Sequence, residues 1–270
     1  MAKYDSLVQR IFLGLRYPSL AYRRLQYFIG DLKSELHKNR IHMYNNFLYD
    51  VREALIKLTN VDSKLVDLAL TDFFNNTQFS SYIDNALNFG YDLLEGGISS
   101  AGDIEPTERL ILYCLVRILK PNIVLETGVA NGVSSAFILK ALDENQKGFL
   151  FSIDLPSVAL KAIFHRDSGW IIPKELRKRW TLYLGKSSSV LPRILPKLKD
   201  SGGVDLFFHD SDHSYDNMMF EFRTVYTFIK DGGLLICDDA TIHDALLDFT
   251  DSVKKNPVII RGTNFGAVRK

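Results

Sequence analysis

Acidic residues and one histidine follow two apolar segments of the sequence. Asp210 and His213 come just after the first segment, and Asp238 and Asp239 come just after the second. Two or three carboxylates that face a common cleft form a site for a hard cation such as Mg²⁺. We therefore expect Asp210, Asp238 and Asp239 to be metal ligands. A metal at this point would lower the pKa of a bound hydroxyl group. Asp210 and His213 are the predicted catalytic residues, with His213 as general base.

Simpler interpretations of the same residues stay open. An aspartate at the end of a strand often caps the next helix, which would explain Asp212 and Asp239 without a metal. A reaction without a metal is a second alternative, and it leaves His213 as the only base. His243 follows the second acidic pair and is a further candidate for the cleft, whereas His209 lies within an apolar strand pattern and is expected to be structural.

A loop with two glycines, Glu126–Gly132, closes another apolar segment and opens a helix. Gly128 and Gly132 lack a Cβ, so the backbone can turn tightly and a ligand can approach it closely. About twenty residues later Asp154 ends the next apolar segment, where a carboxylate can accept hydrogen bonds from both ribose hydroxyls. The spacing Gly-x-x-x-Gly differs from the Gly-x-Gly-x-x-Gly of dinucleotide folds. The carboxylate of Glu126 also disfavours a pyrophosphate, so the loop favours S-adenosylmethionine, a sulfonium ligand without phosphate, over NAD.

The elements that position these residues are indicated by apolar runs that alternate with helical stretches. Continuous apolar runs of about five residues, separated by helices, are typical of a parallel sheet covered on both faces. The runs are residues 123–126, 148–154, 180–184, 204–208 and 233–237, and residues 257–269 are predicted to form a hairpin that turns at Gly262–Asn264. The sequence therefore predicts an α/β fold with a doubly wound, mostly parallel seven-stranded sheet. Such sheets bind ligands outside the carboxyl ends of their strands.

Four motifs occur in an order that resembles the class I S-adenosylmethionine-dependent methyltransferases, and among them the small-molecule group named methyltransferase 24. The motifs are Val124–Ser135, Gly185–Ser187, Phe208–Tyr215 and Asp231–Asp239, and the resemblance covers roughly residues 99–270. It implies a Rossmann-like fold, S-adenosylmethionine as cofactor and methylation of a hydroxyl group. Similar sugar and macrolide O-methyltransferases carry an Asp-x-x-His element and a later acidic pair. The resemblance therefore implies a sugar-like or other hydroxylated small molecule as acceptor.

The resemblance also assigns parts of the cofactor to residues of this chain. Glu126, Gly128 and Asn131 would line the methionine end, Asp154 the ribose, and Gly185–Ser188 the adenine. The expected cofactor-binding residues are Glu126, Gly128, Val129, Asn131, Gly132, Ser134, Ser135, Asp154, Leu155, Gly185, Lys186, Ser187, Ser188 and Asp210.

Residues 1–98 are predicted to form a helical N-terminal region, and residues 99–270 the S-adenosylmethionine-binding methyltransferase domain. The boundary is placed in residues 95–102, which are rich in the small residues that favour loops. Residues 1–40 carry eight basic and three acidic side chains, and their apolar residues have helical spacing. Such a helix usually packs on its own protein. Peripheral contact with an anionic membrane is the alternative.

The overall composition excludes several classes of function. With 46% hydrophobic residues and a formal net charge of +1, the chain is an ordinary globular protein without a global field that attracts nucleic acid. Its two cysteines exclude a disulfide framework, and no apolar run is long enough to span a bilayer. We expect a cytoplasmic enzyme that acts on a small molecule, and a homo-oligomer stays open. A non-catalytic binding or scaffold protein is the alternative from another class.

Overall fold

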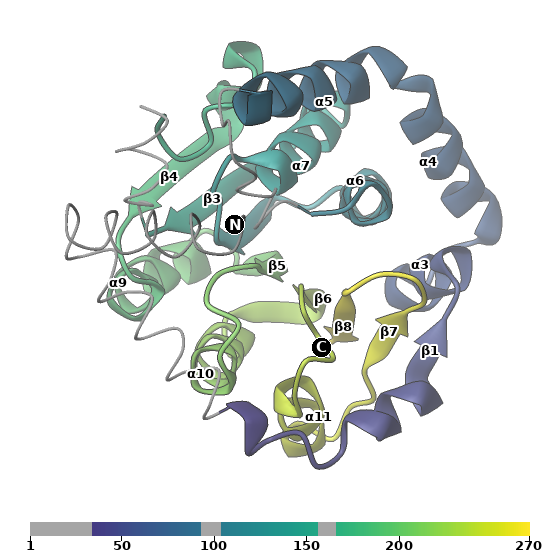
Figure 1. The fold of residues 1–270 in the computed structure, drawn as a ribbon, viewed down its shortest axis with the longest axis vertical. Helices are drawn as coiled ribbons and strands as arrows, with labels where there is room; N and C mark the ends of the chain where they lie inside the picture. Colours follow the sequence, from purple (N-terminus) through teal and green to yellow (C-terminus); the bar gives the residue numbers. More distant parts are fainter. Residues whose placement is uncertain (1–33, 93–103, 156–165) are drawn as a thin grey trace, which may run out of the picture.

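The computed structural model describes residues 34–92, 104–155 and 166–270. Within these ranges eight strands form one sheet in the order β1-β7-β8-β6-β5-β2-β3-β4 (Figure 1). The strands are β1 (Leu48–Tyr49), β2 (Ile123–Thr127), β3 (Phe149–Asp154), β4 (Trp180–Leu184), β5 (Val204–His209), β6 (Ile229–Cys237), β7 (Val258–Ile260) and β8 (Gly266–Arg269). Strand β8 is antiparallel to β6 and β7, and the other neighbouring pairs are parallel.

This arrangement confirms the prediction of a doubly wound, mostly parallel sheet. The five predicted parallel runs correspond to β2–β6, and the predicted hairpin corresponds to β7 and β8. The sheet has one strand more than the seven predicted, because β1 pairs in parallel with β7 at the edge. A strand of two residues is too short to produce a periodic pattern in the sequence.

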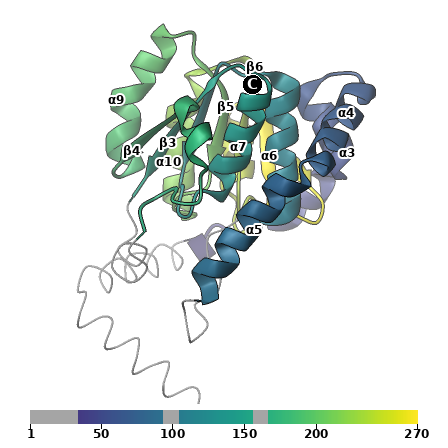
Figure 2. The same cartoon turned by 90° about the horizontal axis from the view of Figure 1, so that it is seen from above.

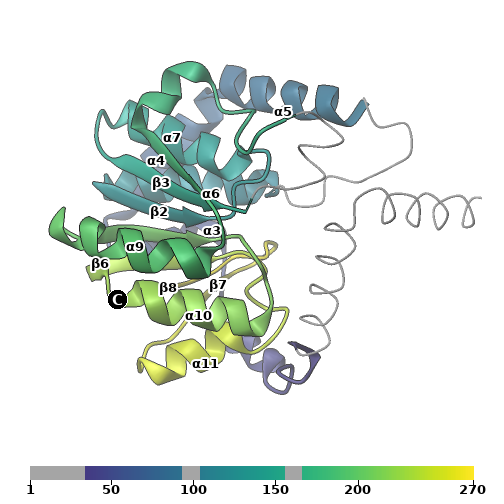
Figure 3. The same cartoon turned by 90° about the vertical axis from the view of Figure 1, so that its left-hand side faces the viewer.

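Helices cover both faces of the sheet. They are α3 (Val51–Thr59), α4 (Ser63–Asn75), α5 (Thr77–Asp92), α6 (Pro106–Leu119), α7 (Val133–Glu144), α9 (Ser187–Asp200), α10 (Tyr215–Tyr226) and α11 (Ala245–Ser252), with the short 3₁₀ helices η1 (Ile41–Phe47) and η2 (Lys174–Arg179). Figure 1 shows α3, α6 and α7 along one face and α9, α10 and α11 along the other. In Figure 2, α3 and α4 lie outside α6, and Figure 3 shows α5 running beside α7.

The two helical layers enclose two hydrophobic cores that share the strands. Along β6, Leu234 and Ile236 face the core under α6 and α7, whereas Leu235 and Cys237 face the core under α10 and α11. Successive side chains of a strand point to opposite faces, so a strand buried on both faces needs a continuous apolar run. The apolar runs of the sequence have this physical cause.

The described part of the N-terminal region packs on the same core as the sheet. Leu55 of α3 and Val66 of α4 are fully buried in the cluster that contains Leu234. The predicted boundary between residues 98 and 99 lies outside the described residues, as does most of the basic segment 1–40. None of the helices in the described ranges has the length and apolar character that a membrane span requires.

Candidate active site

The predicted site residues lie at the carboxyl ends of β2, β3, β4, β5 and β6, where a doubly wound sheet binds its ligands. Parallel pairing brings the ends of β2 and β5 side by side, with Thr127 opposite His209. The backbone N–H of Asp210 donates to the carbonyl of Thr127 over 2.8 Å. The loop after β2 and the loop after β5 therefore start from adjacent points of the sheet.

Gly128 allows these two loops to touch. A Cβ at this position would lie 1.7 Å from the carbonyl oxygen of Asp210, and the residue has a φ of +87°. Gly132 has a φ of +98° and lies just before α7, where a Cβ would lie 2.6 Å from the Cα of Gly169. Both glycines are therefore required by close backbone packing as well as by the turn.

Glu126 is fully buried beneath the glycine loop. Its carboxylate accepts hydrogen bonds from Ser134 and Ser135 at the start of α7, each over 2.6 Å, and from Ser152 of β3 over 2.7 Å. Burial raises the pKa of Glu126 to about 7 despite these three donors. The structure thus places Glu126, Ser134 and Ser135 in one buried polar cluster that fixes the start of α7, and their predicted contacts with a cofactor stay predictions.

The carboxylate of Asp154 faces the glycine loop. Its Oδ1 accepts the backbone N–H of Val129 over 3.0 Å, its Oδ2 accepts the hydroxyl of Ser168, and its carbonyl accepts the N–H of Gly185 over 2.8 Å. The end of β3 is thereby bonded both to the glycine loop Glu126–Gly132 and to Gly185 of the predicted adenine segment. Leu155, the next residue, is 36% exposed.

The remaining predicted cofactor residues border this region. The side-chain oxygen of Asn131 accepts the indole N–H of Trp170 over 2.8 Å. Lys186 precedes α9 in an extended conformation, and Ser187 and Ser188 form the first turn of that helix. Free backbone N–H groups at a helix start are suitable for polar ligand atoms. The structure thus gathers Val129, Asn131, Asp154 and Gly185–Ser188 around the ends of β2, β3 and β4.

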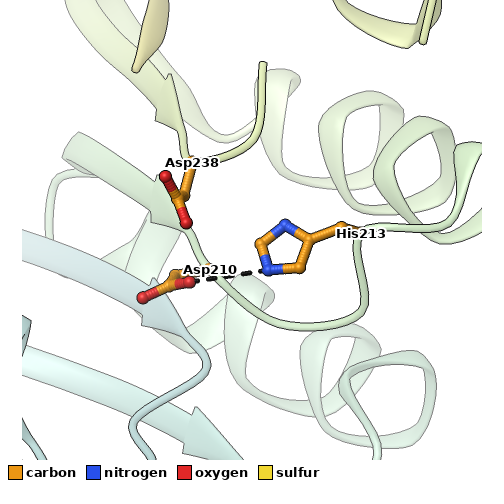
Figure 4. Close-up of side chains that lie close together, drawn as sticks. All are labelled: Asp210, His213 and Asp238. Atoms are coloured by element: carbon orange, nitrogen blue, oxygen red, sulfur yellow. Dashed lines mark ion pairs between the residues drawn. The ribbon is translucent and has the colours of Figure 1, made fainter. Parts of the chain in front are cut away.

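Asp210, His213 and Asp238 converge at the ends of β5 and β6 (Figure 4). Each residue offers one potential ligand atom, and these three atoms lie within 4.8 Å of one another. The Nε2 atom of His213 lies 3.7 Å from Oδ1 of Asp210. Asp239 lies on the other side of the ring, with its Oδ2 3.7 Å from Nδ1 of His213 and with a φ of +50°. Asp210 and Asp238 of the three predicted metal ligands thus lie together with His213, and Asp239 lies beside the histidine ring; metal binding stays a prediction.

Proximity of like charges alters the protonation of this cluster. Burial and the neighbouring charge of Asp238 raise the pKa of Asp210 well above its usual value. Burial, together with Asp239 and Glu108, raises the pKa of Asp238 to about 7. Burial and the charge of His209 lower the pKa of His213 to about 4, although nearby acids act in the opposite direction. His213 is therefore neutral at neutral pH, which is the form that accepts a proton or binds a metal.

His243 contacts the backbone of His213. Its Nε2 lies 2.8 Å from the carbonyl oxygen of His213, and its Nδ1 accepts the backbone N–H of Ala245 over 3.3 Å. Both ring nitrogens of the buried His243 thus have backbone partners. The ring connects the two loops that carry the acidic residues.

Residues 34–44, to which the sequence assigned no role in the site, lie against the same loops. Ser34 accepts the N–H of Tyr215 over 3.0 Å, and the ring of His37 stacks on Tyr215 with 3.6 Å between ring centroids. Tyr44 donates its hydroxyl to the carbonyl of His243 over 3.0 Å. The described part of the N-terminal region therefore packs against the loops that carry the acidic residues.

Comparison with known proteins agrees with this geometry. Residues 125–240 match the model of a family described as a methyltransferase domain. A putative caffeoyl-CoA O-methyltransferase from Staphylococcus aureus is similar in structure, with a TM-score of 0.52 and 13% sequence identity over 75% of this chain and 98% of that chain. Residues 125–240 are therefore those of a methyltransferase domain. The prediction of a class I, S-adenosylmethionine-dependent methyltransferase is thus confirmed for family and fold.

A second solved structure has the same fold as this methyltransferase. It is the SAH-bound methyltransferase PaMTH1 of Podospora anserina, with a TM-score of 0.50, 15% identity and coverage of 72% of this chain and 94% of that one. At such low identities the similarity establishes the fold alone. No curated protein matches the chain by sequence.

One buried acid of the methyltransferase was missed from the sequence. Glu221 of α10 is fully buried and contacts His209, whose predicted structural role is consistent with its full burial in β5. A signal was present, because Glu221 occupies the same helical face as the buried residues Met218, Phe222 and Val225. An acid on an apolar helix face indicates a buried polar partner.

Proposed function

We propose that this methyltransferase transfers the methyl group of S-adenosylmethionine to a hydroxyl group of a sugar-like or other small molecule, assisted by a divalent cation. The observation that carries the proposal is the convergence of Asp210, His213 and Asp238 beside the glycine loop. The names of the similar structures support it, because one is a putative O-methyltransferase and the other is bound to SAH, the product of S-adenosylmethionine after methyl transfer.

The proposed cofactor half of the site consists of backbone turns and the carboxylate of Asp154. Gly128 and Gly132 leave room for a ligand to approach the loop after β2, and Asp154 offers a carboxylate for ribose hydroxyls. Methyl transfer is a direct displacement at carbon, so the protein has to align the acceptor oxygen, the methyl group and the sulfur. A rigid contact between the loops after β2 and β5 serves this alignment.

The acidic cluster fits a divalent cation. Among the described residues, Oδ1 of Asp238 is buried and has no hydrogen-bond partner. Burial and, after it, the neighbouring carboxylates raise the pKa values of Asp210 and Asp238, and a bound cation would favour the ionised form of both groups. Carboxylate oxygens and an imidazole nitrogen are suitable ligands for Mg²⁺ or Mn²⁺. When bound, such an ion would lower the pKa of the acceptor hydroxyl.

His213 is the proposed proton acceptor. Its neutral ring lies between Asp210 and Asp239 at 3.7 Å from each, so a protonated ring would be stabilised by two carboxylates as it forms. The contact with Asp210 also favours a version of the reaction without a metal, in which Asp210 orients His213 and the ring acts alone. The two versions differ in their response to chelation.

The proposal is tested by transfer of labelled methyl groups from S-adenosylmethionine to a panel of sugars, polyols and phenols. We expect transfer to oxygen that falls after chelation, returns with Mg²⁺ or Mn²⁺, and decreases by about 10–100-fold in Asp238→Asn. Asp231→Asn is the matched control, because Asp231 is an exposed acid near the opposite end of β6. Activity that survives chelation and is lost in His213→Ala would favour the version without a metal. Methylation of nitrogen or carbon acceptors alone would refute the proposal.

A further inference from the structure

Glu221 is a fully buried carboxylate that joins three parts of the fold. Its Oε2 accepts the hydroxyl of Thr127 at the end of β2 over 2.5 Å and lies 2.7 Å from Nδ1 of His209 at the end of β5. Its Oε1 accepts the hydroxyl of Ser211 over 2.8 Å. The single side chain thus contacts the strand that leads to the cofactor loop, the strand that leads to the acidic cluster, and the loop that carries that cluster.

The loop after β5 is fixed at a second point by the same helix. Asn217 of α10 donates to the carbonyl of Asp212 over 2.9 Å and also lies 3.3 Å from Oε1 of Glu221. Ser211 and Asp212 lie between Asp210 and His213 in the sequence. The proposed reaction requires Asp210 and His213 at a defined separation. The hydrogen bonds that Glu221 accepts and that Asn217 donates therefore fix the loop of Asp210 and His213 relative to β2.

Glu221 also fixes a hydrogen on one ring nitrogen of His209. An ionised carboxylate is an acceptor only, so Nδ1 of His209 carries the hydrogen of this contact. Burial alone would raise the pKa of Glu221, but the charge of His209 and the hydrogen bonds of its partners hold it below its usual value. The ring of His209 meets the ring of His213 edge to face, with 5.6 Å between centroids. The ring of His209 is thus a second connection, besides the loop, between Glu221 and His213.

Packing alone does not account for an acid at this position. The neighbouring buried residues on the same face of α10 are Met218, Phe222 and Val225, and an apolar side chain among them would avoid the cost of burying a charge. Replacement of buried ionic groups by apolar residues is often neutral or stabilising. The advantage of Glu221 is therefore the defined geometry of the three parts that it connects.

We propose that Glu221 is a positioning residue that holds the Asp210–His213 loop at a fixed distance from the cofactor loop and thereby aligns the acceptor with the methyl group. The inference rests on the proposed function for the reaction that is aligned. Its structural content, coupling of Thr127 and His213 through Glu221, is independent of that function.

The experiment compares Glu221→Gln, Thr127→Val and Thr127→Ser with Thr250→Val. Thr250 is a fully buried threonine of α11 whose hydroxyl bonds only within its own helix, so its variant controls for loss of a buried hydroxyl. We expect Glu221→Gln to lower kcat by about 10–100-fold, as loss of an orienting partner does, while the Kd for S-adenosylmethionine stays unchanged. Thr127→Val lowers kcat by a smaller factor. Thr127→Ser keeps the hydroxyl and retains the wild-type kcat, and Thr250→Val leaves kcat unchanged.

A second readout does not depend on activity. In protein with ¹⁵N-labelled histidine, the imidazole signals of His213 should shift in Glu221→Gln and Thr127→Val but not in Thr250→Val. If these shifts occur while the wild-type protein transfers no methyl group, the proposed function fails and the positioning role stands. Unchanged His213 signals together with an unchanged kcat in Glu221→Gln would overturn the inference. Should Glu221→Gln fail to fold, the Thr127 pair with Ser211→Ala decides the question by the same two readouts.

Discussion

The contact between the loop after β2, Glu126–Gly132, and the loop after β5, which begins with Asp210, can be tested at Gly128. A Cβ in Gly128→Ala would lie 1.7 Å from the carbonyl oxygen and 2.4 Å from the carbonyl carbon of Asp210, so one of the two backbones has to move. The φ of +87° adds a conformational cost of roughly 1–2 kcal/mol for a residue with a Cβ. Overpacking adds about 1–3 kcal/mol. We therefore expect Gly128→Ala to lower the free energy of unfolding by about 2–5 kcal/mol.

Gly262 provides a matched control for the conformational part of this cost. It has a φ of +76° in the turn between β7 and β8, and a Cβ there would meet no atom within 4 Å. Gly262→Ala should therefore cost only about 1–2 kcal/mol. Urea denaturation of both variants measures the difference, provided that the dependence on denaturant is unchanged. The reasoning is refuted if Gly128→Ala is no less stable than Gly262→Ala.

Three further predictions concern ionisation and the N-terminal segment. The affinity for Mn²⁺ should rise with pH up to and slightly above 7, because Asp238, whose pKa is about 7, must lose its proton to bind the ion. Calorimetry at pH 6, 7 and 8 measures the affinity and the protons released. An affinity that does not depend on pH would contradict the prediction. The raised pKa of Glu126 means that the folded state keeps a proton which the unfolded state has released, so stability should fall by about 3 kcal/mol between about pH 4.5 and 7. Glu126→Gln should make the fall in stability over this pH range shallower. An unchanged pH profile of this variant in chemical denaturation would argue against the raised pKa of Glu126. Tyr44→Phe removes the hydroxyl that bonds to His243, which should cost about 1 kcal/mol of stability and also lower kcat; a variant with unchanged activity would show that the N-terminal segment does not support the site.

The fold was predictable where burial on both faces leaves a continuous apolar run. The run at residues 180–184 corresponds to the bounds of β4. Two-residue β1 has no such pattern, and its place at the sheet edge follows from packing of residues far apart in the sequence. The part that the N-terminal region plays beside the acidic loops could not be inferred for the same reason.

The site was predictable as a set of strand ends, but its contacts were not. Sequence order places Asp210 and Asp238 at neighbouring strand ends, and the structure brings them together with His213. The position of Asp239 beside the imidazole depends on its left-handed backbone conformation, which the residue type does not reveal. Glu221 was missed because acids on helices are usually exposed, and only its place on the apolar face of α10 distinguishes it.

Binding of the cofactor tests the central claim most directly. Calorimetric titration of the full chain with S-adenosylmethionine and with NAD compares the two ligands that a doubly wound sheet with a glycine loop could accept. We predict that S-adenosylmethionine binds with a Kd below about 1 mM, that Asp154→Ala weakens this binding, and that NAD produces no binding heat. Binding of NAD without binding of S-adenosylmethionine would contradict it.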